Sequence, residues 1–169
     1  MASKQVFTAT STIDAPAEDV FRWHEEPGAL ERLTPPWEPV EMEQRPASIR
    51  DRARAVLRVG IGPFKLRWVL EHRDYIDGRQ FRDVQISGPF RFWRHTHFFR
   101  PSEDGRSVLE DRVEYILPLG SAGAIFGNWF VRRKLRRLFQ YRHRITKEAM
   151  AARHAVDFDI SRPKTPVNG

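Results

Sequence analysis

Apolar and charged residues alternate along the chain from Trp37 to Pro118, and this alternation constrains the fold more than any other feature. Successive side chains of a β-strand point to opposite faces of a sheet, so a period of two predicts strands with one face in water. Turn signals divide the region at Gly62-Pro63, Asp77-Gly78, Gly88-Pro89 and Asp104-Gly105. The resulting strand-like segments are 38–45, 53–61, 64–76, 79–87, 90–101 and 106–117.

The pairing register follows if each turn is a two-residue hairpin, because cross-strand partners share a face. The predicted pairs are then Leu57–Trp68, His72–Asp83, Asp83–Arg94 and Phe98–Asp111. One face becomes apolar and carries Ala55, Leu57, Val59, Ile61, Leu66, Trp68, Leu70, Phe81, Phe92, Phe98, Leu109, Val113, Tyr115 and Leu117. The other face is charged and includes His95 and His97. Trp93 and Phe99 do not fit this charged face, and a bulge in their strand would turn them inward together with both histidines.

Further elements flank this meander. Residues 4–13 form a predicted strand, Pro16 opens a short helix, and 29–33 form a helical turn. A long helix is predicted from about 124 to 154, with an apolar stripe that can cover the sheet. Its stripe positions are Val131, Leu135, Leu138, Phe139, Arg142, Ile145 and Ala149. We expect one domain over 1–154 and a disordered tail over 155–169, since the last residues are rich in turn formers.

Composition excludes several classes of function. The chain has no cysteine, which rules out disulfides, thiol nucleophiles and thiolate metal sites. It also lacks the glycine-rich nucleotide-binding motifs and the Gly-x-Ser-x-Gly elbow of serine hydrolases. The N-terminal residues contain no apolar segment of signal-peptide length, so we expect a cytoplasmic protein.

The formal net charge of +7 comes mainly from arginines spread over the chain, so no specific nucleic-acid partner is expected. The run from Arg132 to Arg137 lies on one side of the long helix and allows peripheral contact with an anionic membrane. The simpler interpretation of this run is a solvated helix face.

The segments Ile13–Phe21 and Pro27–Trp37 resemble the strand-one and helix-pair region of the START-related, birch-pollen-allergen-like superfamily called SRPBCC, which includes polyketide cyclase/dehydrase-like proteins. Three further motifs are Gly88-Pro-Phe90, Trp93-Arg-His95-Thr-His97-Phe and Asp111-Arg-Val-Glu-Tyr115-Ile-Leu-Pro118. With these, the chain resembles one subgroup of that superfamily more closely. Similar sequences occur alone or ahead of a nucleotide-sugar-epimerase-like domain. The resemblance implies an α+β helix-grip fold, β-α-α-β6-α, in which a curved antiparallel seven-stranded sheet surrounds the C-terminal helix. It also implies a ligand, because members bind sterols, lipids, hormones or polyketides, and some are cyclases.

A ligand pocket is expected between the apolar sheet face and the long helix. The side chains predicted to contact the ligand are Leu57, Trp68, Leu70, Phe92, Arg94, Phe98, Asp111, Val113, Tyr115, Leu135 and Phe139. In the predicted register four polar side chains also project from this apolar face: His72, Asp83, Arg94 and Asp111. They form either an ion-pair network or a polar anchor, with Arg94 binding an acidic group and His72 acting as acid or base.

The pair His95 and His97 is the weak candidate for a metal site, with Glu110, Glu114 or His72 as third ligand. Solvent-exposed histidines paired with glutamates are the simpler interpretation, so neither a metal nor a cofactor is predicted.

The primary functional hypothesis is binding of a small hydrophobic ligand that is lipid-like, sterol-like or polyketide-like. Two alternatives stay open. One is a cofactor-independent cyclase or dehydratase that uses the polar cavity residues, and the other is a lipid binder at anionic membrane surfaces.

Overall fold

The computed structural model describes residues 3–61, 64–118 and 121–161. Its element order confirms the predicted β-α-α-β6-α architecture. The elements are β1 (Gln5–Ile13), α1 (Ala17–Glu25), α2 (Ala29–Arg32), β2 (Val40–Gln44), β3 (Arg54–Ile61), β4 (Phe64–Ile76), β5 (Gln80–Ser87), β6 (Phe92–Pro101), η1 (Glu103–Gly105), β7 (Ser107–Ile116) and α3 (Ser121–Ser161). Among these described residues, no helix combines membrane-spanning length with the hydropathy that a span requires.

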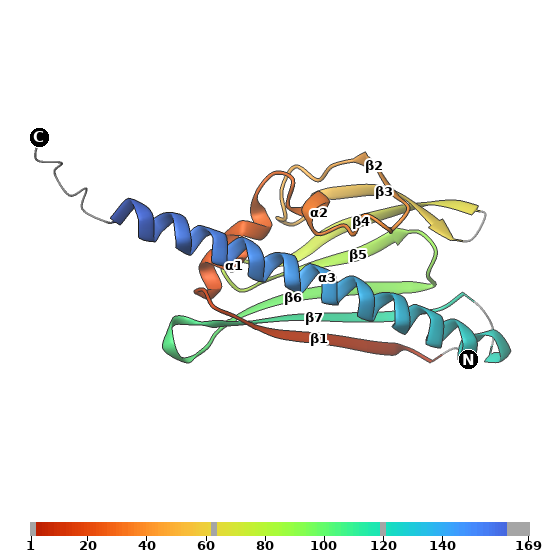
Figure 1. Cartoon of the computed structure of the whole chain (residues 1–169). Helices are drawn as coiled ribbons and strands as arrows, with labels where there is room; N and C mark the ends of the chain where they lie inside the picture. Colours follow the sequence, from red (N-terminus) through yellow and green to blue (C-terminus); the bar gives the residue numbers. More distant parts are fainter. Residues whose placement is uncertain (1–2, 62–63, 119–120, 162–169) are drawn as a thin grey trace, which may run out of the picture.

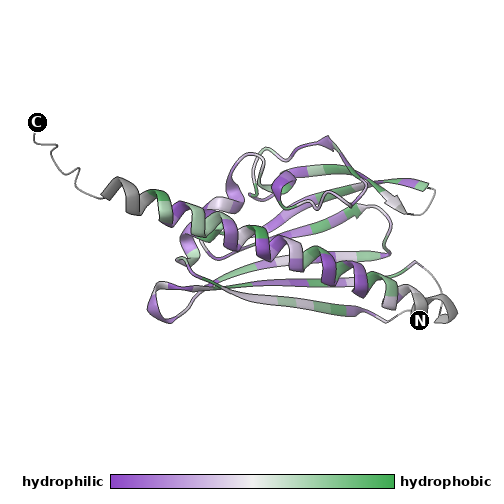
Figure 2. Ribbon diagram, in the orientation of Figure 1, coloured by the Kyte–Doolittle hydropathy of each residue, from purple (hydrophilic) through white to green (hydrophobic). Residues whose placement is uncertain are grey.

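The strands form one antiparallel sheet in the order β1-β7-β6-β5-β4-β3-β2. In Figure 1, α3 runs along one face of this sheet, and α1 and α2 lie near one end of it. Apolar and polar residues follow one another along the strands and along α3, as Figure 2 shows. The predicted α+β helix-grip fold is therefore confirmed, with α3 covering the face that the alternation had marked as apolar.

Two apolar clusters hold the helices on the inner face of the sheet. Beneath α1, the fully buried Phe21 packs edge-on against Phe99, with ring centroids 5.2 Å apart. Beneath α3, Phe139 stacks on Phe7 of β1 at 5.8 Å. The edges of these clusters border the interior space described below, so the same contacts that stabilise the fold also position its site.

α3 continues past the predicted domain limit at residue 154 and ends at Ser161. No glycine or proline occurs between Asn128 and Ser161, so nothing in that stretch ends the helix earlier. Residues 155–161, which were expected to belong to a disordered tail, form the end of this helix. The remaining part of the predicted tail, 162–169, lies outside the described residues.

β6 is shifted by one residue from the predicted register, whereas the β3–β4 and β4–β5 pairs Leu57–Trp68 and His72–Asp83 are as predicted. The observed pairs are Asp83–His95 and His97–Asp111, in place of the predicted Asp83–Arg94 and Phe98–Asp111. Because side chains alternate along a strand, a shift of one residue turns each of them to the opposite face.

The turns on either side of β6 explain the shift, since neither is a two-residue hairpin. Before β6, the Gln85 side chain bonds both backbone groups of Phe90: its Nε2 donates to the Phe90 carbonyl at 2.7 Å, and the Phe90 N–H donates to Oε1 at 3.3 Å. After β6, Pro101 pairs with Ser107, and Asp104 in the intervening turn takes a left-handed φ of 58°. Both turns therefore need more residues than the dipeptide signals predicted.

The shift exchanges the two faces of β6. Trp93, His95, His97 and Phe99 are buried, so the inward alternative that the two misfit aromatics had suggested is the observed arrangement. Its cause is the length of the turns and not a bulge within β6. The predicted inward positions of three β6 residues are wrong, namely Phe92, Arg94 and Phe98.

Candidate functional site

A cavity of about 720 Å³ lies between the inner face of the sheet and α3, bordered by α2 and the segment 45–49. Several residues that were predicted to form the site do line this cavity: Leu57, Trp68, Leu70, His72, Asp83, Leu135 and Phe139. Among the described residues, Val113 and Tyr115 instead lie in the packed core, fully buried. Contact of the lining residues with a ligand remains a prediction.

The outward-facing residues of β6 make surface contacts. Nε of Arg94 donates to Oε2 of Glu114 at 2.6 Å on the outer face of the sheet. The Arg100 guanidinium lies over the ring of Phe98 on that face, 4.8 Å from its centroid. Arg94 therefore cannot anchor a ligand inside the cavity, which corrects the role predicted for it.

The cavity is apolar at one end and polar at the other. β4 and β6 run in the same direction because both are antiparallel to β5. α3 runs in this direction as well (Figure 1). On these three elements an apolar lining residue comes earlier in the sequence and a polar one later: Trp68 then His72 on β4, Trp93 then His97 on β6, and Leu135 then Arg142 on α3. A molecule in the cavity would thus meet an apolar wall on one side and a group of titratable side chains on the other.

Asp83 accepts hydrogen bonds from two imidazoles at the polar end. Nε2 of His72 lies 3.0 Å from Oδ1, and Nε2 of His97 lies 3.2 Å from Oδ2. Nδ1 of His72 donates to the Ser48 carbonyl oxygen at 2.9 Å, which ties the segment 45–49 to the sheet. Burial alone would raise the pKa of Asp83, but these imidazoles hold it well below its usual range.

Asp111 lies deeper and is bound by three imidazoles. Its Oδ1 is 2.7 Å from Nε2 of His95 and 2.8 Å from Nδ1 of His97, and its Oδ2 is 2.7 Å from Nε2 of His143. His143 belongs to α3, so this buried carboxylate links the helix to the sheet. Burial opposes ionisation, but the charge on His97 and these hydrogen bonds keep the pKa of Asp111 well below its usual range.

His97 bridges the two carboxylates through both ring nitrogens. A carboxylate accepts hydrogen bonds, so the ring satisfies both partners as a doubly protonated imidazolium. Burial lowers the pKa of His97, but Asp111 and then Asp83 outweigh this and raise it to about 9. At neutral pH the polar end of the cavity therefore has a buried imidazolium, His97, held between two buried carboxylates.

His24 lines the same cavity in the opposite protonation state. Its Nδ1 donates to the Val20 carbonyl oxygen at 2.8 Å, which leaves Nε2 as an acceptor. Burial lowers the pKa of His24 to about 3, so the ring is neutral at physiological pH. The ring centroids of His24 and His97 are 6.4 Å apart. A neutral imidazole and an imidazolium therefore lie side by side at the polar end.

Among the residues that the structure describes, the group that could hold a metal ion is Asp83, His95 and His97, whose ligand atoms lie within 4.8 Å of one another. Oδ2 of Asp83 is 3.6 Å from Nδ1 of His95 and 3.2 Å from Nε2 of His97. A metal ligand must be deprotonated at the coordinating atom, and both nitrogens of His97 already donate to carboxylates. A metal would therefore have to displace a strongly held proton. His95 and His97 stay weak metal candidates, and Asp83, the third member of this group, was not among the third ligands predicted from the sequence.

The predicted third ligands Glu110 and Glu114 lie apart from this group. Their side chains pair with Arg100 and Arg94 on the outer face of the sheet. They cannot complete a metal site inside the cavity.

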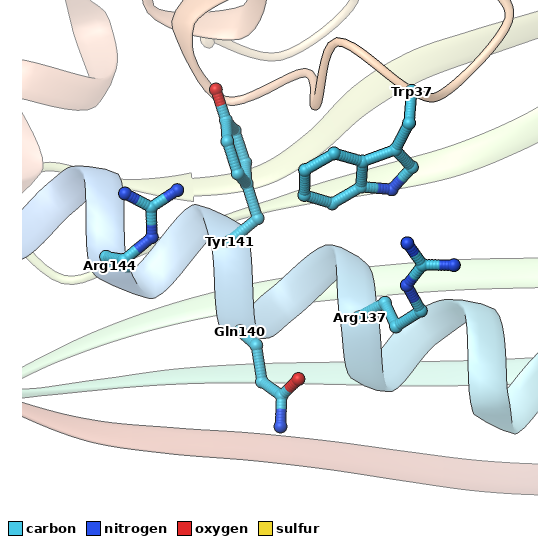
Figure 3. Close-up of a pocket in the computed structure, with 5 residues that line it drawn as sticks. All are labelled: Trp37, Arg137, Gln140, Tyr141 and Arg144. Atoms are coloured by element: carbon cyan, nitrogen blue, oxygen red, sulfur yellow. The ribbon is translucent and has the colours of Figure 1, made fainter.

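A second, smaller pocket of about 270 Å³ lies on the outside of α3 (Figure 3). Trp37 meets Tyr141 edge-on with ring centroids 5.2 Å apart, Arg137 lies over Trp37, and Arg144 lies over Tyr141. Because these side chains already stack on one another, the pocket is best explained as packing of the loop after α2 against the helix.

Two polar residues, His24 and Arg142, are among the cavity residues that sequence reasoning missed as members of the site. Arg142 had been placed in the apolar stripe of the long helix, and His24 follows Val20 by four residues, on the apolar side of α1, where a polar side chain is unusual. A titratable residue within an apolar stripe was thus the signal that could have identified them. His143 lies one position from the stripe and carried no such signal.

Several solved structures share this fold. A nucleoside-diphosphate sugar epimerase from Corynebacterium glutamicum is 27% identical with a TM-score of 0.66, and the match covers 86% of this chain and 29% of that one. Norcoclaurine synthase from Thalictrum flavum, in complex with dopamine and hydroxybenzaldehyde, is 15% identical with a TM-score of 0.64, covering 89% and 88%. Zhui aromatase/cyclase from Streptomyces sp. R1128 is 15% identical with a TM-score of 0.66, covering 88% and 94%.

This chain spans 29% of the length of the Corynebacterium protein, so the activity of that whole protein is not evidence for this one. No curated protein is detectably similar in sequence. A family model described as polyketide cyclase/dehydrase and lipid transport matches residues 13–142, which is more than half of the chain. The match agrees with the superfamily that the motifs had indicated. The chain therefore belongs to the polyketide cyclase/dehydrase and lipid transport family.

Proposed function

We propose that this protein binds a small hydrophobic ligand in the cavity beneath α3. The observation that carries the proposal is an interior space of about 720 Å³ whose walls include Leu57, Leu70 and Leu135. Protein interiors are close-packed, and an unfilled space of this size destabilises a fold. Ligand sites are typically apolar cavities of about 300–1,000 Å³ with a few placed polar groups, and this cavity has that composition.

The comparisons support the same class of ligand. The family description names lipid transport together with polyketide cyclases, and the Streptomyces neighbour is an aromatase/cyclase. A lipid-like, sterol-like or polyketide-like molecule would present apolar surface to the tryptophan-rich end of the cavity. Its polar group would then reach the histidine-rich end.

Native mass spectrometry of the purified protein is the first test, because a ligand that co-purifies adds its mass to the intact chain. The second is titration with N-phenyl-1-naphthylamine, a neutral fluorophore that brightens in apolar surroundings. We expect saturable binding to one site. A protein that carries no ligand and also takes up no fluorophore would contradict the proposal.

A second candidate is a cofactor-independent cyclase or dehydratase, and the pair His24 and His97 favours it. Acid–base sites typically contain two neighbouring titratable groups whose surroundings shift their pKa values in opposite directions. The pKa of His97 is raised to about 9 and that of His24 is lowered to about 3. In a dehydration, the Nε2–H of His97 would have to exchange its 3.2 Å hydrogen bond to Asp83 for one to the departing hydroxyl, which it would protonate. The unprotonated Nε2 of His24 would accept the proton from the neighbouring carbon.

A β-hydroxyketone probe tests this second candidate, since dehydration releases one water and forms a conjugated, absorbing product. We expect turnover by the wild-type protein and a loss of at least about 100-fold in His97→Gln, as for removal of a general acid. The variant must still bind the fluorophore, which shows that the cavity is intact. Equal turnover by the variant, or no turnover by the wild type, would rule out this candidate.

The membrane-surface alternative depends on two exposed aromatic residues. Trp129 and Phe130 of α3 are 64% and 50% exposed, and Arg133 and Lys134 lie over their rings. Phe130 also lines the cavity, so this surface adjoins its apolar end. Flotation with vesicles that contain or lack anionic lipid tests it. Binding only to anionic vesicles, lost in a Trp129→Ala/Phe130→Ala double variant, is the expected result, whereas absence of flotation would contradict it.

A further inference from the structure

We infer that the ligand carries an anionic group, a carboxylate or an enolate, and that the Arg142 guanidinium binds it at the polar end of the cavity. This inference rests on the proposed ligand-binding function and narrows its ligand to an amphipathic monoanion.

Arg142 differs from the other basic residues that line the cavity. Nζ of Lys134 is 3.0 Å from Oε2 of Glu38, and the Arg45 guanidinium pairs with Glu31. Among the described residues, the Arg142 side chain makes one hydrogen bond, from Nε to the Leu33 carbonyl oxygen at 3.1 Å, and its guanidinium lies 5.7 Å from the centroid of the Phe139 ring. Within the described part of the chain, no carboxylate lies within 4.0 Å of its guanidinium. It is therefore the cavity cation that lacks a bound anion.

The nearby carboxylates cannot supply the missing partner. Asp83 and Asp111 act on Arg142 only through longer-range attraction, because imidazoles already occupy their oxygen atoms. Burial, which disfavours the charged guanidinium, lowers the pKa of Arg142. A buried charge without a partner is unfavourable, so a bound anion would stabilise this end of the cavity.

The remaining geometry of Arg142 suits a group with two acceptor oxygens. With Nε bonded to Leu33, the two terminal nitrogens are left as a parallel pair of donors. Such a pair matches a carboxylate in a bidentate arrangement. A single negative charge fits better than a phosphate dianion, because Asp83 and Asp111 already place two negative charges in the network.

Because one end of the cavity is apolar and the other is polar, the orientation of the bound ligand is fixed. Arg142 lies two turns of α3 beyond Leu135, and Trp68 precedes His72 on β4. An anionic head at Arg142 therefore places the apolar body against Trp68 and Leu135. The unprotonated Nε2 of His24 can accept a hydrogen bond from a hydroxyl on the same ligand.

Dodecanoate and 1-dodecanol are matched probes, because they share a chain length and differ in the charge of the head. We would measure both dissociation constants for the wild type and for Arg142→Met, with Arg136→Met as control, since Arg136 is an exposed arginine of the same helix. The wild type should bind dodecanoate at least about 10-fold more tightly than the alcohol, as for charge-assisted hydrogen bonds. Arg142→Met should abolish that preference, while Arg136→Met should keep it.

Equal binding of both probes by the wild type would overturn the anionic ligand and leave the hydrophobic cavity intact. Binding of neither probe would contradict the proposed function itself. A preference for dodecanoate that persists in Arg142→Met would assign the anion to another residue. If Arg142→Met does not fold, Arg142→Lys replaces it in the same measurement. A lysine keeps the positive charge but not the paired donors, so the preference for dodecanoate should fall at least about 3-fold. An unchanged preference for dodecanoate would count against the inference.

Discussion

Nδ1 of His97 lies 2.8 Å from Oδ1 of Asp111, and the two residues are direct cross-strand partners on β6 and β7. Both side chains are buried, at 5% and 3% exposure. The ion pair therefore exists only because β6 presents His97, and not Phe98, to the inside of the sheet. Its energetics give the fold a pH dependence that can be measured.

The free energy of unfolding should fall as the pH rises above neutrality. The folded pKa of His97, about 9, lies above its ordinary value of 6.5, so its stabilisation is complete below pH 6.5 and disappears as the pH approaches 9. Urea unfolding between pH 6 and 9.5 measures this loss. His97→Gln should flatten the curve, whereas replacement of the exposed His154 by glutamine should not. A wild-type curve without this slope would contradict the assigned protonation of His97.

Below about pH 6.5, the free energy of unfolding should depend on pH in the opposite direction. The folded pKa of His24, about 3, lies below its ordinary value of 6.5, so the unfolded chain takes up a proton that the folded chain does not. The free energy of unfolding should therefore decrease between pH 6.5 and 4, and His24→Leu should reduce that decrease. Below about pH 4 the depressed pKa values of Asp83 and Asp111 add a second loss. An identical acid slope in wild type and His24→Leu would show that His24 is not held neutral.

Removal of Asp111 and removal of Arg94 should have very different effects on stability. Asp111→Ala leaves three buried imidazoles without their carboxylate, which typically costs about 3–5 kcal/mol. Arg94→Ala breaks a partly exposed pair with Glu114, which is worth about 1 kcal/mol or less. Chemical denaturation of both variants gives the comparison. Similar losses in the two variants would mean that Arg94 points inward, as the two-residue-turn register had predicted.

The fold could be predicted because its signals are repeated along the chain. Each strand is marked by alternation and each boundary by a turn signal, and the apolar stripe of α3 matches the apolar face of the sheet. The register of β6 could not be predicted, because it depends on the Gln85 side chain and the left-handed Asp104, which set the lengths of its turns. Trp93 and Phe99 did indicate the error, because the predicted register placed these large aromatic side chains on the charged face of the sheet.

The site was predicted less well than the fold for the same reason. His72 and Asp83 lie on strands whose register was correct, and they line the cavity as predicted. The anchoring role given to Arg94 depended on β6, and the error in that strand removed it from the cavity. Arg142 was visible within the apolar stripe of α3, but a stripe does not show which of its members face a cavity and which are packed.

The central claim, that the space beneath α3 holds a ligand, is tested most directly by a pair of valine variants. Val59 lines the cavity, whereas Val113 is fully buried in the packed core. Val59→Phe should weaken binding of N-phenyl-1-naphthylamine at least about 10-fold with little loss of stability, because the new ring enters empty space. Val113→Phe should cost about 1–3 kcal/mol through overpacking and leave binding by the folded protein unchanged. Unchanged binding in Val59→Phe, with a stability loss equal to that of Val113→Phe, would contradict the cavity and the function proposed from it.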